Sequence, residues 1–220
     1  MTATKPSVPG PYVGTSGWSY PSWRPDFYPS GTKPNEFLGR YAERLPSVEL
    51  NSTGYRIPAE EQFQRWAEQT PDTFRFAVKM QAYQLRQAAT FEERVRLLGE
   101  RLGPIRILVT QARDEGFLTF ALGSLDPALR IAFDFRHDSW AGIELPENAV
   151  RINDVEAKAP FRYLRYREPP YTDKAIEGIA NDIRPLVASG IEVFAYFRHE
   201  DEPTAPQYAE RLLELLAKPS

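Results

Sequence analysis

Short apolar runs rich in β-branched and aromatic residues recur along the chain, and segments with helical spacing of apolar positions separate many of them. We count eight such runs: "YVGTS" from Tyr12, "SVELNS" from Ser47, "FRFAVK" from Phe74, "IRILVT" from Ile105, "RIAFDF" from Arg130, "AVRIND" from Ala149, "FRYLRY" from Phe161 and "IEVFAYF" from Ile191. Strand-length runs that alternate with helical segments are typical of βαβ units. The pattern therefore predicts an α/β protein whose strands pair in parallel.

Three segments between these runs place their apolar residues on one helical face. The stripes consist of Phe37, Leu38, Tyr41 and Leu45, of Phe91, Val95, Leu98 and Leu102, and of Tyr208, Leu212, Leu215 and Leu216. For the second stripe, Thr90 and Glu93 predict a capping box at the start of the helix, and Gly103-Pro104 predicts its end. We interpret all three stripes as surfaces that pack on the core, because amphipathic helices of globular proteins bury their apolar face.

The number of predicted strands favours a (β/α)8 barrel of the TIM type, a fold of about 250 residues that can be nearer 200. An open doubly wound sheet is the alternative. Residues 154–160 leave too little chain for a helix between the sixth and seventh strands, because a parallel crossover normally takes about a dozen residues. We therefore expect one or two irregular or short crossovers. The 20 prolines form no linker, which predicts a single domain over residues 1–220.

The composition excludes several classes of protein. There is no cysteine, so disulfides and thiolate chemistry are excluded, as is typical of a cytoplasmic protein. The N-terminal segment "MTATKPSVPGP" lacks the apolar stretch of a signal peptide, and no run approaches the roughly 20 apolar residues that span a bilayer. The net charge is −3, so a protein-wide basic field for nucleic acid is absent. We expect a cytoplasmic protein without a membrane partner, and the sequence leaves the oligomeric state open.

Charged residues follow the apolar strands at their carboxyl ends. Side chains alternate across a strand, so Asp134 and Arg136 share the barrel-facing side of the fifth strand. The same sorting predicts a polar rim made of Glu49, Asn51, Lys79, Gln111, Asp134, Arg136, His137, Asn153, Asp154, Arg165, Arg167, Tyr196, Arg198 and His199. Active sites of TIM-type barrels lie at this end of the strands.

Cations outnumber carboxylates in this predicted rim. An unpaired buried charge costs several kcal/mol, so the surplus arginines need solvent or a bound anion. The planar guanidinium pairs bidentately with phosphate or carboxylate, which makes Arg136, Arg165, Arg167 and Arg198 candidate anion ligands. The alternative is an internal ion network, in which Glu49 and Asp134 neutralise arginines and fill the top of the barrel.

Three residues are candidates for proton transfer. Glu49 and Asp134 could act as an acid/base pair, as in glycoside hydrolysis. His137 ends a strand and has an ordinary pKa of about 6.5, which suits a general acid or base. For His199, within "FRHEDEP", a hydrogen-bonded loop histidine is at least as good an interpretation.

Cofactor and metal sites have little support. The phosphate-binding motifs G-x-x-x-x-G-K-[ST] and G-x-G-x-x-G are absent, and "GTSGW" has the wrong order for a serine elbow. Glu49, Asp134, Asp154 and the two histidines could assemble a metal centre, although no H-E-x-x-H spacing supports it. We therefore assign no cofactor and no metal ligand, and keep a divalent-metal-dependent hydrolase as an alternative.

Aromatic residues flank the predicted rim. They are Trp18, Tyr20, Trp23, Tyr55 and Trp140. Such rings can stack on a sugar or a base, or they can cover the barrel top as packing. For Trp23 we favour packing.

Five motifs resemble the YecE-like proteins, also called domain-of-unknown-function family 72. They are "VGTSGWSYPSWRPDFYP", "VELNSTGYRIP", "TPDTFRFAVKM", "FDFRHDSW" and "VFAYF". The resemblance implies a TIM-type barrel without an established reaction. The pocket residues that it implies are Gly17, Trp18, Tyr20, Glu49, Asn51, Thr53, Tyr55, Lys79, Arg136, Trp140, Asp154 and Arg165.

The chain departs from the family pattern at three strand ends. It has Arg167 and Glu168 in place of histidine and glycine, Arg198 and His199 in place of asparagines, and "QAYQLRQ" in place of a threonine-histidine pair. If those family histidines are catalytic, this chain binds without reacting or uses His137 instead.

Our leading hypothesis is an enzyme, a hydrolase or isomerase, that binds a small anionic substrate such as a phosphate ester or acidic sugar. Glu49, Asp134 or His137 would transfer the proton. Trp18, Tyr20, Asn51, Tyr55, Lys79, Arg136, Trp140, Asp154, Arg165, Arg167 and Arg198 would bind the substrate. The alternative is a protein that binds a ligand or single-stranded nucleic acid through the same rim without catalysis.

Overall fold

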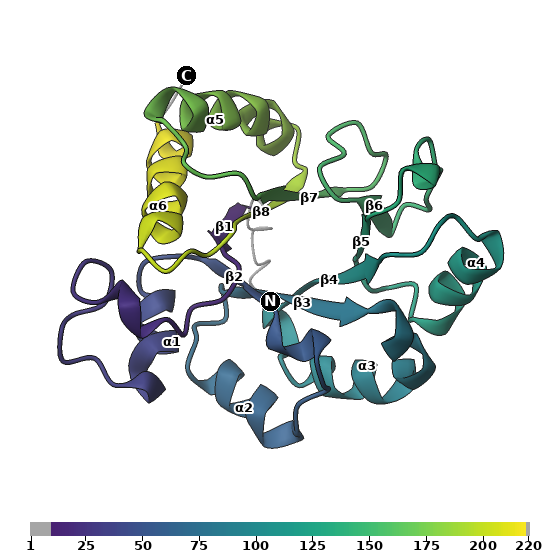
Figure 1. The fold of residues 1–220 in the computed structure, drawn as a ribbon, viewed down its shortest axis with the longest axis horizontal. Helices are drawn as coiled ribbons and strands as arrows, with labels where there is room; N and C mark the ends of the chain where they lie inside the picture. The colour runs from purple at the N-terminus through teal and green to yellow at the C-terminus, as the bar shows by residue number, and fades with distance from the viewer. Residues whose placement is uncertain (1–9, 219–220) are drawn as a thin grey trace, which may run out of the picture.

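The computed structural model describes residues 10–218, and eight parallel strands form a nearly closed barrel in it (Figure 1). The strands are β1 (Pro11–Thr15), β2 (Ser47–Leu50), β3 (Arg75–Gln81), β4 (Leu102–Val109), β5 (Ile131–Phe135), β6 (Ala149–Arg151), β7 (Phe161–Tyr166) and β8 (Glu192–Phe197). Their order is β6-β5-β4-β3-β2-β1-β8-β7. The predicted TIM-type barrel is confirmed. The predicted lack of a signal peptide concerns a segment that lies almost wholly outside the described residues.

The α-helices lie outside the strands (Figure 1). They are α1 (Phe37–Ala42), α2 (Glu60–Glu68), α3 (Ala88–Arg96), α4 (Glu115–Ser124), α5 (Asp173–Ala188) and α6 (Thr204–Ala217). Between residues 136 and 160, the two connections on either side of β6 contain no α-helix. The predicted short or irregular crossovers are therefore present, and there are two of them.

The predicted end of the second helical stripe is wrong. Leu102 and Gly103-Pro104 lie inside β4, and α3 already ends at Arg96. A Cβ atom on Gly103 would lie 2.9 Å from the carbonyl oxygen of Phe76 in β3. Glycine is therefore needed here because the backbones of two strands approach closely, and it does not stop a helix.

The predicted capping box at the start of α3 is also wrong. The N-cap residue is Gln87, whose side chain makes no capping hydrogen bond. The preceding 3-10 helix (Ala82–Gln87) runs directly into α3, so the chain is already helical when it reaches Thr90. Thr90 lies within the first turn of α3, where its side chain cannot act as a cap.

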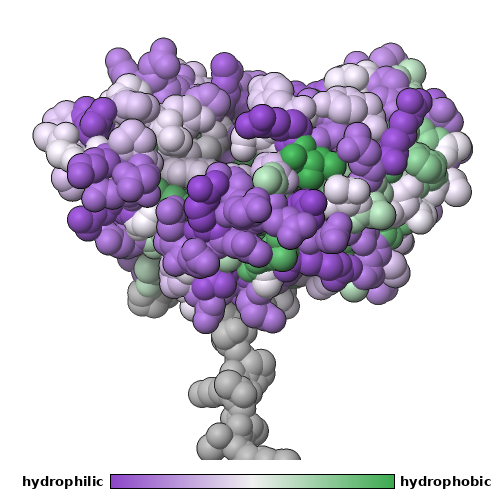
Figure 2. Space-filling model, turned by 90° about the horizontal axis from the view of Figure 1, so that it is seen from below, coloured by the Kyte–Doolittle hydropathy of each residue, from purple (hydrophilic) through white to green (hydrophobic). Residues whose placement is uncertain are grey.

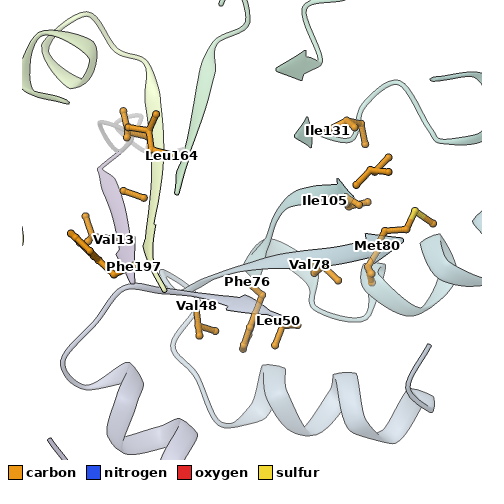
Figure 3. Packing of buried hydrophobic residues seen from close by; sticks show 14 of the residues in the cluster. Val13, Val48, Leu50, Phe76, Val78, Met80, Ile105, Ile131, Leu164 and Phe197 are labelled. Atoms are coloured by element: carbon orange, nitrogen blue, oxygen red, sulfur yellow. The ribbon is translucent and has the colours of Figure 1, made fainter. Parts of the chain in front are cut away.

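Apolar side chains form one layer outside the strands and a second layer inside the barrel. The outer layer lies between strands and helices, and its side chains point away from the barrel interior (Figure 3), among them Val13, Val48, Leu50, Phe76, Val78, Met80, Ile105, Ile131, Leu164 and Phe197. The inner layer includes Ala77, Ala132, Val150, Phe161, Tyr163, Phe194 and Tyr196. The interior is therefore packed, as in other TIM-type barrels, and a ligand can enter only at an end.

Asn153 joins the two strands at the ends of the sheet order. No ladder joins β6 to β7 within residues 10–218. Instead, the backbone N–H of Asn153 donates to the carbonyl of Tyr163 at 2.9 Å, and the side-chain amide donates to the carbonyl of Arg165 at 3.2 Å. The amide oxygen accepts from the backbone N–H of Arg165 at 2.6 Å. Asn153 has a φ of 60°, a left-handed conformation that asparagine tolerates well.

One side of the molecule is largely polar (Figure 2). The side of the molecule in Figure 2 is hydrophilic over most of its area, with hydrophobic residues in small separate groups. Within the described part of the chain, no helix combines the length and the apolar character that a bilayer crossing requires.

Candidate anion-binding site

A cavity of about 390 Å³ opens at the carboxyl ends of the strands. Its lining residues come from seven of the eight strands or the positions directly after them: Ser16, Asn51, Tyr55, Lys79, Arg106, Leu108, Arg136, Arg165, Arg167, Arg198 and His199. Six of these side chains belong to lysine or arginine, and among the described residues no carboxylate lines the cavity. We call the cavity that these residues line the basic cavity.

Glu49 lies beneath the basic cavity and is fully buried. Its Oε2 accepts a hydrogen bond from the Tyr163 hydroxyl at 2.6 Å, and its Oε1 accepts from Arg106 at 3.1 Å and from Arg165 at 2.9 Å. Burial raises the pKa of the Glu49 carboxyl, but the two arginines and the Tyr163 hydrogen bond together outweigh it. The pKa of Glu49 is therefore below its ordinary value, and the carboxylate stays charged.

Asp134 is the second buried carboxylate and is surrounded by arginines. Its Oδ2 accepts from Arg106 Nε at 2.9 Å, Arg106 Nη2 at 2.5 Å and Arg167 Nη2 at 2.8 Å. Arg136 Nε lies 3.0 Å from Oδ1. Burial raises the pKa of Asp134, and Arg106, Arg167 and Arg136 lower it by more, so the pKa is below its ordinary value.

Arg106 connects the two carboxylates, although it is not among the residues of the predicted rim. It lies in β4 and is 2% exposed. In "IRILVT", Ile105, Ile107 and Val109 face the outer layer, so alternation assigns Arg106 to the interior. The predicted rim comprises residues toward the carboxyl ends of the strands, and Arg106 lies three residues before the end of β4.

An internal ion network and a surplus of positive charge coexist in this site. Arg106, Arg136, Arg165 and Arg167 share Glu49 and Asp134. Lys79 and Arg198 form no ion pair with any described residue, and the buried Nε of Arg167 has no hydrogen-bond partner there. The network therefore neutralises only part of the charge around the basic cavity.

The two histidines differ in position. His199 lines the basic cavity, stacks on Tyr20 with the ring centroids 4.6 Å apart, and has its Nδ1 3.1 Å from the Ser16 hydroxyl oxygen. Burial is the main cause that lowers the pKa of His199, followed in the same direction by Arg198 and Arg165. His137 is exposed, and its Nδ1 lies 2.8 Å from the Ser139 hydroxyl. His137 does not line the cavity.

The aromatic candidates also differ in whether they line the cavity. Tyr55 lines the cavity and is 77% exposed. Trp140 is buried, stacks on Phe135 at 4.3 Å and donates to the Gln111 carbonyl at 2.9 Å. The structure thus places Trp140 in the core.

Trp18 and Tyr20 are partly buried against the outer apolar layer. Trp18 contacts Trp66 edge to face, with centroids 6.0 Å apart, and the Tyr20 hydroxyl donates to the Ser16 carbonyl at 3.0 Å. Trp23 is fully buried, as we expected for a packing residue. Of the rim aromatics, Tyr55 alone lines the basic cavity in the described chain.

Asp154 lies outside the basic cavity. It lines a neighbouring hollow with Asp134, Arg136 and Arg167, and its Oδ1 accepts from the Glu156 backbone at 3.1 Å. Across residues 10–218, histidine, aspartate and glutamate do not form any group of three or more that could hold a metal ion.

The comparisons with known proteins agree with these motifs and this fold. Residues 12–220 match the family model described as "Protein of unknown function DUF72". The chain is 36% identical over 170 residues to the UPF0759 protein YunF of Bacillus subtilis, covering 75% of this chain and 55% of YunF. It is 40% identical over 78 residues to the UPF0759 protein YecE of Escherichia coli K12, covering 36% of this chain and 26% of YecE. The chain thus aligns with about half of YunF and about a quarter of YecE.

Two solved structures share the fold. A DUF72 family protein from Enterococcus faecalis superposes with a TM-score of 0.79 at 17% identity, covering 96% of this chain and 97% of that one. A DUF72 family protein from Thermotoga maritima superposes with a TM-score of 0.73 at 20% identity, covering 94% and 99%. The resemblance inferred from the sequence motifs is confirmed. Because the family model matches residues 12–220, the chain belongs to the DUF72 family of proteins of unknown function.

Proposed function

We propose that the basic cavity binds a small anionic ligand, such as a phosphate ester or an acidic sugar, as the substrate of an enzyme of the hydrolase or isomerase type. One observation carries this proposal: six cationic side chains and no carboxylate line the cavity in the described chain. Several like charges held close together repel one another, and an anion between them removes that repulsion. Arginine also offers paired N–H donors that match phosphate or carboxylate oxygens.

The position of Glu49 and Asp134 indicates which groups of the site can transfer a proton. Glu49 and Asp134 lie behind the cavity lining, where one oxygen of each carboxylate accepts hydrogen bonds from at least two arginines. Carboxylates with lowered pKa values are weak proton acceptors near neutral pH. We therefore assign Glu49 and Asp134 to holding the arginines in place, and Lys79 and His199 to the reacting side of the cavity.

Single-stranded nucleic acid is the second candidate ligand. Tyr55 and Tyr83 are 77% and 60% exposed, and the Tyr83 hydroxyl donates to the Gly54 carbonyl next to Tyr55 at 3.2 Å. Exposed aromatic rings beside cations are typical of surfaces that stack unpaired bases. This reading predicts that affinity increases with the length of an oligonucleotide and decreases steeply with salt.

Isothermal titration calorimetry with inorganic phosphate, a phosphate monoester and a short oligonucleotide tests the proposal. Arg198→Gln is the informative variant, because Arg198 lines the cavity and pairs with no carboxylate of the described chain. A charged hydrogen bond contributes about 1.5–3 kcal/mol, so we expect phosphate affinity to decrease at least about tenfold. Arg40→Gln is the matched control, since Arg40 is exposed on α1 and pairs with Glu43.

Phosphate binding by the parent protein that is weakened by Arg198→Gln and unchanged by Arg40→Gln supports the proposal. Equal effects of the two variants would show that phosphate responds only to net charge, and the proposal would then be wrong. Binding of the oligonucleotide without binding of phosphate would favour the second candidate.

A further inference from the structure

The side chain of Lys79 lies at the wall of the basic cavity, and its aliphatic part packs against the backbone of Gly54. Lys79 lies in β3, and its side chain passes the short 3-10 helix η3 (Ser52–Gly54). A Cβ atom on Gly54 would lie 2.8 Å from Cδ and 3.0 Å from Cε of Lys79. The missing side chain of Gly54 therefore leaves the space that the lysine stem fills. The ammonium nitrogen lies 5.3 Å from the centroid of the Tyr55 ring.

Within residues 10–218, Lys79 has no counter-ion, although carboxylates lie nearby. Among the described residues, it makes no ion pair and no side-chain hydrogen bond, while Glu49 and Asp134 are occupied by arginines. Arginine remains protonated under all ordinary conditions, whereas lysine loses its proton readily when buried. Among the lysine and arginine side chains that line the cavity in the described chain, Lys79 is thus the one that can become neutral.

The surrounding charges favour the neutral amine. Burial is the largest cause that lowers the pKa of Lys79, and Arg106 and Arg165 lower it further. Glu49 and Asp134 act in the opposite direction but do not cancel these effects. The result is a pKa below the ordinary value of 10.5, and a neutral amine is the nucleophilic form.

We propose that Lys79 is a nucleophile that forms an imine with carbonyl compounds bearing a carboxylate or phosphate group, such as α-oxo acids and phosphorylated aldehydes or ketones. This inference rests on the proposed anion site and deepens it. Arg165, Arg167 and Arg198 line the same cavity as Lys79. These arginines bind the anionic group of the substrate. The amine of Lys79 then attacks the carbonyl carbon.

The covalent step is balanced without an added oxidant or reductant. The lone pair of Lys79 Nζ attacks the carbonyl carbon, and the π electrons of the C=O bond move to the oxygen, which takes up a proton. The resulting carbinolamine loses water, which gives a protonated imine between Nζ and the former carbonyl carbon. The positive charge of this imine withdraws electrons from the adjacent bonds, which is the chemical use of lysine imines in catalysis.

Reductive trapping on the full chain tests this step. Glyoxylate is the anionic aldehyde, propionaldehyde is the neutral control, and borohydride supplies the hydride that converts an imine into a stable secondary amine. Peptide mass spectrometry then locates the modified lysine. We expect glyoxylate to modify Lys79 ahead of the exposed lysines, inorganic phosphate to suppress this modification, and propionaldehyde to show no preference for Lys79.

Three variants test whether Lys79 acts as a nucleophile or only as a cation that attracts the anion. Lys79→Arg keeps the cation, so we expect it to bind phosphate and to lose the trapped adduct. Gly54→Ala keeps the lysine but places a methyl group where its stem lies, so we expect slower trapping. Lys174→Arg removes an exposed lysine in α5 and is the control, which should leave trapping at Lys79 unchanged.

The results distinguish this inference from the anion site on which it rests. If phosphate binds and glyoxylate modifies the lysines evenly or spares Lys79, the imine proposal is overturned and the anion site stands. If phosphate does not bind and trapping at Lys79 is also absent, both proposals fail. If Lys79 is trapped with glyoxylate and propionaldehyde alike, the amine is reactive but the anionic substrate class is wrong.

Discussion

Arg106 donates two hydrogen bonds to one oxygen of Asp134, from Nε at 2.9 Å and from Nη2 at 2.5 Å. The third nitrogen of the same guanidinium, Nη1, donates to Glu49 at 3.1 Å. A single arginine thus holds both buried carboxylates of the barrel mouth. Because all three groups are almost completely buried, removing one of them leaves a charge without compensation.

Arg106→Met should therefore destabilise the protein strongly. Removing one partner of a buried ion pair costs about 3–5 kcal/mol, because the remaining charge is stranded. Urea unfolding should show a decrease of this size in the free energy of unfolding. Arg40→Gln, which breaks an exposed pair with Glu43, should change it by less than about 1 kcal/mol. Similar losses for both variants would show that the buried network does not contribute as we argue.

The fold was largely predictable because it depends on a repeated pattern. Every strand was found at the right place in the chain, since apolar alternation is repeated eight times. The errors lie where tertiary packing decides a boundary. Gly103-Pro104 reads as a helix end, yet Gly103 lies inside β4, where close contact with β3 requires it.

The site was only partly predictable from the sequence. Alternation selected Glu49, Asp134 and Lys79, because the pleat fixes which side of a strand faces inward. It could not place His137 and Trp140, since both lie beyond the end of β5, where the alternation of the strand no longer applies. Which arginines pair with Glu49 and Asp134 also depends on how residues distant in the sequence meet across the barrel.

The acid stability of the protein should depend on the buried carboxylates. The pKa values of Glu49 and Asp134 in the folded state are below their ordinary values of 4.5 and 3.8. Protons therefore bind more tightly to the unfolded chain, so the stabilisation is complete above these ordinary values and is lost as the pH falls through the lower folded values. Urea unfolding at a series of pH values below about 5 measures this loss.

Glu49→Gln should make the acid-dependent loss of stability shallower, because the amide does not titrate in this range. Glu43→Gln is the control, since Glu43 is exposed on the surface. If Glu49→Gln leaves the pH dependence as steep as in the parent protein, Glu49 does not have a lowered pKa.

The contact between β6 and β7 should depend on Asn153. Asn153→Ala removes two side-chain hydrogen bonds to Arg165 and places alanine in the left-handed conformation. At about 1 kcal/mol for each hydrogen bond and about 1–2 kcal/mol for the conformation, we expect a total loss of roughly 3–4 kcal/mol. Asn153→Gly removes the same bonds without the conformational strain.

Thermal and urea unfolding of the two variants separate these contributions. Asn153→Gly should be less destabilised than Asn153→Ala. Amide hydrogen exchange should increase at Arg165 in both, because its backbone N–H loses the Asn153 oxygen as acceptor. Unchanged exchange at Arg165 would contradict the role of Asn153 in joining the two strands.

Gly14 should tolerate no side chain, because β1 passes close to β2 at this position. A Cβ atom there would lie 1.8 Å from the carbonyl oxygen of Ser47, its partner in β2, and 2.9 Å from the Tyr41 hydroxyl. The Tyr41 hydroxyl donates to this same Ser47 carbonyl and accepts from the Thr15 backbone N–H. Gly14→Ala must therefore separate β1 from β2 and disturb buried hydrogen bonds together.

We expect Gly14→Ala to cost at least about 3 kcal/mol of unfolding free energy, the upper end for overpacked interiors, or to prevent folding. Gly31→Ala is the matched control, because a Cβ atom on Gly31 meets nothing within 4 Å. Circular dichroism establishes whether each variant folds, and urea unfolding gives the loss for those that do. A Gly14→Ala variant as stable as Gly31→Ala would show that β1 and β2 do not pair at this register, and the barrel mouth built on them would have to be redrawn.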